Sequence, residues 1–194
     1  MARAKGSKQE QLIQAARSLF FKYGFKRVTV EEICRTADVS KVTFYRNFRD
    51  KTELLKAVIS RMADDRLAGF TAVMKQDLPF PERMRRLVEM RLAQAGEVNR
   101  DFLREVYVSA PPEIHEFLHQ KTRDMLATAM DYYIRAQQDG AVRPDIKPEF
   151  IAWFFNHLVD MMGDERLVAL YDSSRELAAE VINLFLHGIL ARKE

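Results

Sequence analysis

Cysteine, glycine and proline are scarce in this chain of 194 residues. There is one cysteine, Cys34, together with seven glycines and six prolines. A single cysteine excludes an internal disulfide and a zinc cluster built on cysteines, and its apolar neighbours favour a buried structural thiol. No apolar run approaches the roughly 18 residues of a membrane span, and the amino-terminal MARAKGSKQEQ lacks the apolar stretch of a signal peptide. We therefore expect a soluble, cytoplasmic protein.

Charge is distributed unevenly along the chain, although its net value is only +3. Residues 1–60 carry 13 Lys and Arg against 6 Asp and Glu, whereas residues 61–194 carry 18 against 22. A basic first third joined to a mildly acidic remainder is typical of a protein whose one end faces a polyanion. Nucleic acid is the first candidate partner, and an anionic lipid surface is the second.

The hydrophobic pattern is helical along nearly the whole chain, and no segment of useful length alternates as a half-buried strand does. Leu12, Ala16 and Leu19 recur at spacings of four and three before Gly24, which predicts a helix over residues 8–23. By the same signals, further helices are predicted over 30–37, 40–48 and about 51–75, and then near 82–96, 100–109, 112–138, 148–163 and 174–191. The expected fold class is therefore all-α.

Two of the predicted helices are short and follow each other closely. Thr29 opens the sequence Thr-Val-Glu-Glu, a capping box in which its hydroxyl accepts a hydrogen bond from the amide of Glu32. Ser40 is the N-cap of the next helix and lies three residues after Ala37. Two short helices joined by such a turn are typical of a helix-turn-helix motif.

The second of these helices has an outer surface that suits the major groove of DNA. Phe44 and Phe48 lie four residues apart and are expected to face the core, which leaves a polar face directed outward. That face consists of Lys41, Val42, Thr43, Tyr45, Arg46 and Asn47. Lysine and arginine can donate to guanine or phosphate, and threonine and valine can contact a thymine methyl group. A solvated amphipathic helix without a ligand is the alternative interpretation. The compact motif disfavours a membrane-surface role, which one long cationic amphipathic helix would suit better.

The segment LIQAARSLFFKYGFKRVTVEEICRTADVSKVTFYRNFRDKTELLKAV, residues 12–58, resembles the DNA-binding domain of the tetracycline-repressor (TetR) family of bacterial transcriptional regulators. Its most specific stretches are AARSLFFKYGF, TVEEI and VSKVTFYRNF. The resemblance implies a regulator that is not an enzyme and uses no cofactor. By this resemblance, Lys41, Val42 and Thr43 approach base edges. The expected phosphate-side set, with the N-cap, is Thr29, Ser40, Tyr45, Arg46, Asn47 and Lys51.

Two residues depart from the family pattern. Asp38 stands where the family often has a turn glycine, and Val42 stands where it commonly has a small residue. Aspartate tolerates left-handed backbone geometry better than most residues, so the turn is expected to survive. The branched side chain of Val42 limits close backbone approach, so no base preference is carried over. An amino-terminal arm with Arg3, Lys5 and Lys8 is expected either to follow DNA or to be a solvated tail.

We expect two domains: a helix-turn-helix domain over residues 1–52 and a helical effector-binding and dimerisation domain over residues 53–194, connected by the helix of about 51–75. The predicted helices over 148–163 and 174–191 are apolar on more than one side, so they need covering on more than one side. A homodimer joined in a four-helix arrangement is expected, and a deeply buried monomer core is the alternative. The expected interface residues are Trp153, Phe154, Leu158, Met161, Leu177, Val181, Leu184, Phe185 and Gly188. Such a dimer would read a palindromic operator on double-stranded DNA.

The family resemblance also implies a small-molecule effector that binds the carboxy-terminal helices and releases a repressor from its operator. Residues that can wall an effector pocket are Met90, Phe102, Tyr107, Met125, Tyr132, Trp153 and His157. Each is equally an ordinary core residue type. A constitutive DNA-binding protein without an effector is the alternative function.

One rival motif points to metal chemistry. The sequence His115-Glu116-Phe117-Leu118-His119 matches the H-E-x-x-H pattern of zinc hydrolases. The extended form of the pattern needs Gly and His downstream, where Thr122 and Met125 stand, and no third ligand has a recognisable spacing. We therefore interpret the segment as ordinary helix surface, with His115 and His119 as weak metal candidates and a zinc hydrolase as the remote alternative.

Overall fold

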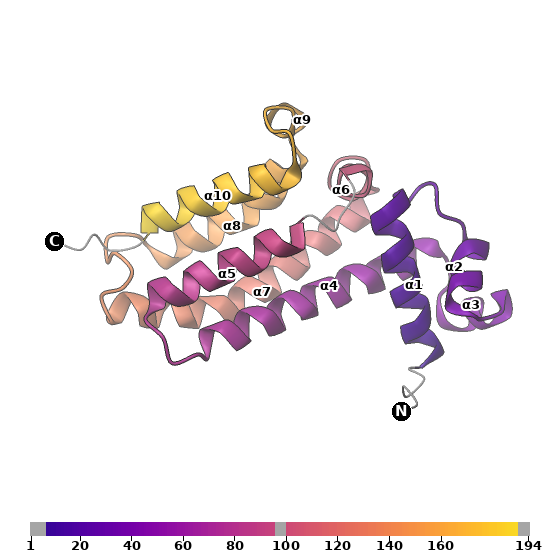
Figure 1. Ribbon diagram of the computed structural model, residues 1–194, viewed down its shortest axis with the longest axis horizontal. Helices are drawn as coiled ribbons and strands as arrows, with labels where there is room; N and C mark the ends of the chain where they lie inside the picture. Colours follow the sequence, from indigo (N-terminus) through magenta and orange to yellow (C-terminus); the bar gives the residue numbers. More distant parts are fainter. Residues whose placement is uncertain (1–6, 96–99, 190–194) are drawn as a thin grey trace.

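A computed structural model describes residues 7–95 and 100–189 of the chain, and in these ranges the secondary-structure elements are helices. They are α1 (Lys8–Tyr23), α2 (Val30–Ala37), α3 (Lys41–Asn47), α4 (Lys51–Met74), α5 (Phe80–Ala95), α6 (Arg100–Tyr107), α7 (Pro112–Gln138), α8 (Pro148–Gly163), α9 (Glu165–Val168) and α10 (Ser174–Ile189) (Figure 1). The all-α prediction is confirmed. Of the predicted arm, Arg3 and Lys5 lie outside the described residues, whereas Lys8 is the first residue of α1. None of the described helices is both long and apolar enough to cross a membrane.

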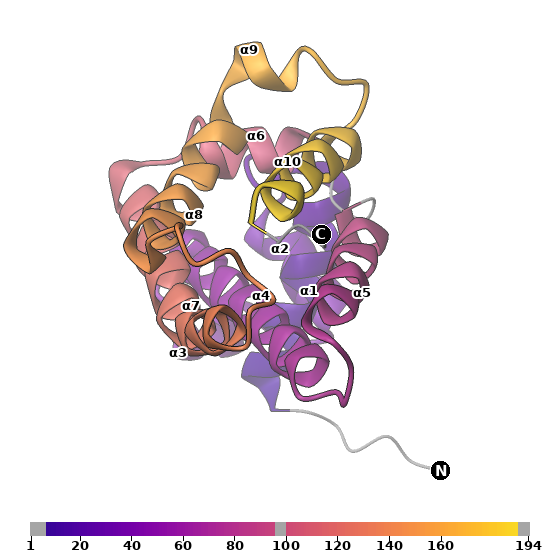
Figure 2. The same ribbon diagram turned by 90° about the vertical axis from the view of Figure 1, so that its left-hand side faces the viewer.

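The molecule is elongated, and α4 runs from one end into the other. Figure 1 shows α1, α2 and α3 gathered at one end, with the longer helices extending away from them. Seen end-on in Figure 2, α4, α5, α7, α8 and α10 run alongside one another. Direct packing joins α4 to α5 and α7, α7 to α8, and α5 to α10, while α6 packs on α1. The helix-turn-helix segment is thus held at the tip of a helical bundle.

The first three helices form where the sequence provides caps and apolar spacing. Thr29 accepts a hydrogen bond from the Glu32 amide at 3.2 Å, and its own amide donates to the Glu32 carboxylate at 2.8 Å, so the predicted capping box is present. Ser40 caps α3 by accepting from the Thr43 amide at 3.1 Å. The inward-facing side chains are fully buried, including Leu12, Phe20, Ile33, Phe44 and Leu54. The amino-terminal core is therefore the one that the apolar periodicity predicts.

The turn between α2 and α3 forms without a glycine. Asp38 adopts φ 52° and ψ 52°, which is the left-handed region that a short polar side chain tolerates. The Val39 amide then donates to the carbonyl oxygen of Cys34 at 3.0 Å, which closes the end of α2. Cys34 itself is buried, and this burial raises the pKa of its thiol. The turn therefore survives as expected, and the expected burial of Cys34 is confirmed.

A second apolar core fills the far end of the bundle. It consists of Val73 and Met74 of α4, Phe80 and Met84 of α5, Tyr133 and Ala136 of α7, Ile151 of α8 and Ile189 of α10, with Val142 from the connection between α7 and α8. That connection also closes the end of α10, because the amide of Arg143 donates to the Ile189 carbonyl at 3.0 Å and its guanidinium donates to the Gly188 carbonyl at 3.1 Å. These hydrogen bonds hold the connection between α7 and α8 against the end of α10, which is distant in sequence.

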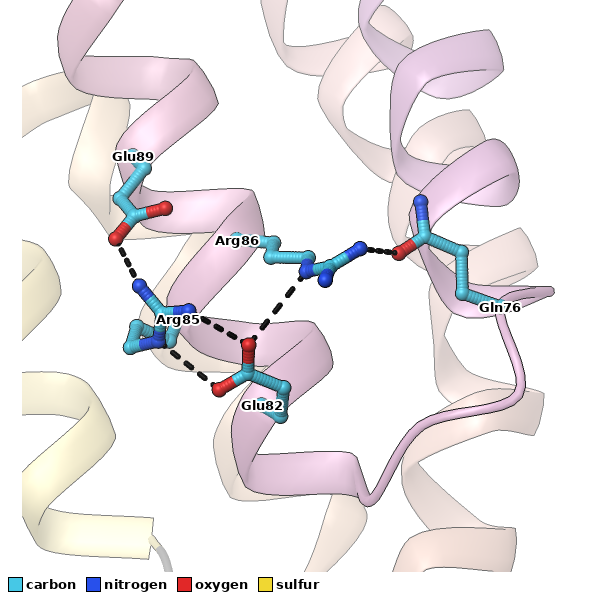
Figure 3. Close-up of polar contacts among 5 residues, drawn as sticks. All are labelled: Gln76, Glu82, Arg85, Arg86 and Glu89. Carbon is cyan, nitrogen blue, oxygen red and sulfur yellow. Dashed lines mark hydrogen bonds and ion pairs between the residues drawn. The ribbon is translucent and has the colours of Figure 1, made fainter.

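The turn between α4 and α5 is braced on its outer side by a polar network, shown in Figure 3. Arg86 donates to the side-chain oxygen of Gln76 at 2.7 Å, across the turn. Arg85 donates to both carboxylate oxygens of Glu82, at 2.9 and 2.6 Å, and is also paired with Glu89. The arginines drawn in Figure 3 are therefore matched by local acceptors and do not form a cationic patch.

The helix predictions differ from the structure at α9, at the start of α5 and at the end of α6, which is Tyr107 and not residue 109. The four-residue helix α9 was not predicted, because so short a segment shows no periodicity; the Asp164 carboxylate accepts from the Arg166 amide at 2.8 Å at its start. Helix α5 begins at Phe80, two residues earlier than predicted, since Pro81 fits the first turn of a helix and does not delay it.

A candidate DNA-binding surface

Helix α3 is anchored by its inner side chains and presents its outer side to solvent. Phe44 and Phe48 are buried, and their ring centres lie 6.1 Å apart. On the opposite side, Val42 is 60% exposed and Tyr45 is 59% exposed. A short, fixed helix with an accessible outer face has the shape that a major groove admits.

The predicted contact residues fall into two groups, and the first group is available for a ligand. Val42, Tyr45 and Arg46 all lie on the exposed side of α3. Within the described ranges, the side chains of Tyr45 and Arg46 make no hydrogen bond or ion pair. The outer side of α3 thus exposes a branched apolar side chain, a phenol and a guanidinium to solvent.

The second group is already engaged inside the motif. Lys41 forms an ion pair with Glu31 of α2. The hydroxyl of Thr43 lies 3.0 Å from that of Ser40, and the Asn47 side-chain amide donates to the Thr43 carbonyl at 2.7 Å. These contacts hold the start and the end of α3, so any DNA contact by the same side chains replaces or adds to an internal bond.

Lys51 was expected to approach a phosphate, and the structure gives it another role. Its ammonium group donates to the backbone carbonyls of Phe25 and Val28, each at 2.8 Å, and of Lys26 at 3.3 Å. It also lies 4.4 Å from the centre of the Phe25 ring. Since an ammonium has three donors, its capacity is used within the chain. Burial lowers the pKa of Lys51, against the opposing effect of nearby Glu105. The residue holds the α1–α2 connection in place.

Glu105 of α6 binds the same connection from the other side and was not predicted. Its carboxylate accepts hydrogen bonds from the backbone amides of Phe25 and, at 3.0 Å, of Lys26. The close approach depends on Gly24, whose φ is +83° and where an added Cβ would lie 3.0 Å from the carboxylate. The sequence signal was slight: Glu105 shares a helix side with the apolar Phe102 and Val106, both of which are buried.

The predicted effector residues do not line one pocket. Phe102 is buried against α1, with its ring 6.3 Å from that of Phe20, because α6 packs on the amino-terminal core. Tyr107 packs on that same core, while Met90 and Tyr132 pack on the core at the far end, and Met125 is half-buried on α7.

The remaining two predicted pocket residues face outward. Trp153 is 56% exposed, and its ring stacks on that of His157 with 4.0 Å between centres. An open hollow among the described residues lies along α4 and is lined by Asp64, Leu67, Ala68, Thr71, Ala72 and Lys75. None of the predicted effector residues belongs to it, and their role in binding an effector stays a prediction.

The predicted dimer residues are placed differently from one another. Leu184 is 70% exposed and Trp153 is also exposed, as an uncovered interface requires. Gly188 is exposed too, with nothing within 4 Å of the position of an added Cβ. Leu177, by contrast, is 1% exposed and belongs to the interior, which corrects that prediction. Phe154, Val181 and Phe185 are half-buried; the side chains of Leu158 and Met161 lie outside the described residues.

The zinc pattern on α7 finds no support in the described part of the chain. No group of three His, Cys, Asp or Glu side chains there is placed to hold a metal ion. His115 and His119 are both half-buried, and the Nε2 atom of His115 is buried without a hydrogen-bond partner among the described residues. A third ligand, which a hydrolytic zinc site requires, is missing from this region.

Comparison with known proteins agrees with this geometry. The model of the bacterial regulatory proteins of the tetR family matches residues 12–58, which span most of α1, all of α2 and α3, and the start of α4. The chain is 23% identical over 160 residues to the HTH-type transcriptional repressor Rv1474c of Mycobacterium tuberculosis, covering 79% of each chain. It is 27% identical over 148 residues to the HTH-type transcriptional regulator UidR of Escherichia coli, covering 70% of this chain and 69% of that relative.

The whole fold is shared as well. A TetR-family transcriptional regulator from Rhodococcus sp. matches 95% of this chain and 98% of its own, with a TM-score of 0.72 and 20% sequence identity. The shared architecture includes the carboxy-terminal bundle, which lies beyond the segment that the family model matches. From the helix-turn-helix surface, the amino-terminal match and the common fold, residues 12–58 carry a DNA-binding segment of the tetR type, and the whole chain is similar to transcriptional regulators with this fold.

Proposed function

We propose that the protein is a transcriptional repressor that binds a palindromic operator as a homodimer and leaves it when a small-molecule effector binds. The observation that carries the DNA-binding part is the outer face of α3, where Val42, Tyr45 and Arg46 are available on a helix anchored by buried Phe44. The similarity to a mycobacterial repressor supports repression. A regulator that acts on a bacterial chromosome works in the cytoplasm.

Residues 1–52 form the DNA-binding domain in this proposal, and residues 53–194 form the effector and dimerisation domain, with α4 as the connection. Lys41, Val42 and Thr43 read base edges in the major groove, whereas Thr29, Tyr45, Arg46 and Asn47 contact phosphates. Ser40 caps α3 and directs its first amides toward the DNA. Lys51 supports this surface from within, through its bonds to the α1–α2 connection.

The homodimer is supported by the exposed apolar side chains of α8 and α10. Phe150, Trp153 and Leu184 each expose more than half of their surface, and Gly188 leaves room for close approach. Large exposed apolar groups on adjacent helices favour an interface. Two-fold symmetry then places two copies of α3 on one face of DNA, about one helical turn or more apart.

The test is selection of bound duplexes from a random DNA pool by the full-length protein at about 150 mM salt, where nonspecific attraction is screened. The expected result is a palindromic sequence. Recovery without an enriched sequence would overturn sequence-specific binding, and an enriched sequence without two-fold symmetry would overturn the dimeric arrangement. A screen for compounds that release the selected duplex then tests the effector.

A further inference from the structure

The apolar core at the far end of the bundle buries a hydroxyl group that lacks a hydrogen-bond partner. Tyr133 of α7 is 7% exposed, and its hydroxyl finds no partner among the described residues. The buried residues in this part of the chain include no polar or charged side chain that could accept its proton. Burial raises the pKa of Tyr133 above its usual value, so the hydroxyl stays protonated and remains a donor.

A second unpartnered donor lies beside the same aromatic ring. Arg83 of α5 donates from one terminal nitrogen to the Met74 carbonyl at 2.8 Å, but its Nε atom is buried without a partner in the described ranges. The guanidinium carbon lies 5.7 Å from the centre of the Phe80 ring. Phe80 in turn packs edge-on against Tyr133, with 6.2 Å between ring centres. The Tyr133 hydroxyl and the Arg83 Nε atom thus belong to two residues that both contact Phe80, and neither atom has an acceptor among the described residues.

The side chains around these donors are adaptable and apolar. Met74 and Met84 belong to the same core, and Met90 and Met130 pack at its margin. The Phe185 ring lies 6.1 Å from that of Tyr133. Methionine side chains change rotamer easily and fill irregular spaces, so such a core can rearrange around a guest molecule. An apolar body fits these surroundings, and an oxygen acceptor fits the two donors.

We propose that the effector is an apolar molecule with an anionic oxygen group, such as a medium-chain carboxylic acid, and that Tyr133 and Arg83 bind this group. An ionised carboxylate offers acceptors and no donor, which matches two unpaired donors, and the positive charge of Arg83 favours it over a neutral group. A buried donor without a partner carries a desolvation cost that the ligand removes. The inference rests on the proposed function, because it identifies the class of effector.

The experiment is calorimetric titration of the full-length protein with decanoate and, separately, with 1-decanol, which has the same chain without the charge. Decanoate is expected to bind at least about tenfold more tightly than decanol. Tyr133→Phe removes one oxygen atom and is expected to weaken decanoate binding about tenfold. Tyr23→Phe is the matched control, since Tyr23 is 42% exposed at the end of α1, away from this core.

A second pair of variants tests the cation independently. Arg83→Gln is expected to weaken decanoate binding, whereas Arg86→Gln, on the outer network of the same helix, is expected to leave it unchanged. The inference is overturned if decanoate does not bind, if decanol binds equally well, or if the two members of either pair behave alike. Operator selection is measured without decanoate. If the inference is overturned but an operator is still recovered, the proposed DNA-binding function therefore stands.

Discussion

Lys41 begins the helix that we assign to the major groove, yet in the protein without DNA its charge is already paired with a carboxylate. Its ammonium is paired with Glu31, and the two side chains are 53% and 60% exposed. The pair lowers the pKa of Glu31 and raises that of Lys41, so both stay ionised at neutral pH. In the proposed complex, DNA would take the ammonium from a carboxylate that then stays near the phosphates. We therefore expect Glu31 to oppose DNA binding by Lys41.

Replacing Glu31 by Gln is expected to raise the affinity for the selected operator about two- to fivefold at about 100 mM salt, since an exposed pair is weak and its loss modest. Fluorescence anisotropy with labelled duplex measures this. The gain should vanish in a Lys41→Gln background, because Glu31 acts through Lys41. Glu116→Gln, the same charge change on α7, should have no effect. Weaker binding by Glu31→Gln would mean that Glu31 orients Lys41 for DNA.

Lys51 is a residue whose charge is used for folding. Lys51→Met keeps most of the apolar stem but removes the donors to three carbonyl groups. We expect the free energy of unfolding to fall by about 2 kcal/mol, measured by urea denaturation, because partly buried carbonyls lose their partners. If stability were unchanged and the salt dependence of DNA binding fell by about one phosphate contact, Lys51 would be a phosphate ligand instead.

At the scale of elements, the α1–α2 connection is held between opposite charges from two other helices. Glu105 of α6 accepts from its amides, and Lys51 of α4 donates to its carbonyls. The hydrogen bond between Lys26 and Glu105 spans 79 residues of sequence. Since α6 belongs to the carboxy-terminal bundle, a shift of α6 changes the support of the helix-turn-helix segment directly.

Glu105→Ala is expected to release this contact. The free energy of unfolding should fall by about 2 kcal/mol, because two amides lose an anionic acceptor. Hydrogen exchange should accelerate at the amides of Phe25 and Lys26, which is a local readout that general destabilisation does not imitate at low denaturant. Glu113→Ala is the control. Like Glu105, Glu113 makes a contact between elements, but this contact is an exposed 3.7 Å ion pair between α7 and Lys56 of α4. Unchanged exchange at both amides would contradict the assigned role of Glu105.

Elements with local signals were predictable from the sequence, and contacts between elements were not. Thr29 and Ser40 indicate helix starts in the sequence, because a capping residue and the amide that it binds lie only three residues apart. Phe102 was named as a possible pocket wall and also as an ordinary core residue type, and it is buried. The sequence did not indicate what covers this residue, and α1 covers it where a ligand pocket was expected. Lys51 and Glu105 bind partners distant in sequence, which a pattern within one segment cannot specify.

For the whole molecule, the exposed apolar surface of α8 and α10 is the part that would join two DNA-binding domains in the proposed homodimer. Phe150 and Trp153 stack with 6.3 Å between ring centres, and both are more than half exposed. The ring of Phe154 stacks on that of Phe185 at 5.6 Å, which ties α8 to α10. Two helices that are in contact and expose apolar side chains are suited to a four-helix interface with a second copy.

Leu184→Glu is expected to prevent this assembly, because it would bury two unpaired carboxylates at a two-fold interface. Sedimentation of the wild type should give a dimer, and that of the variant should give a species near the chain mass of 22.6 kDa. Ile134→Glu, at an apolar α7 side chain with 39% exposure, should remain dimeric. Because operator affinity multiplies over two half-sites, the monomeric variant should also lose nearly all specific binding while keeping weak, salt-sensitive attraction to any duplex. A monomeric wild type that still selects a palindrome would place dimerisation on the DNA itself.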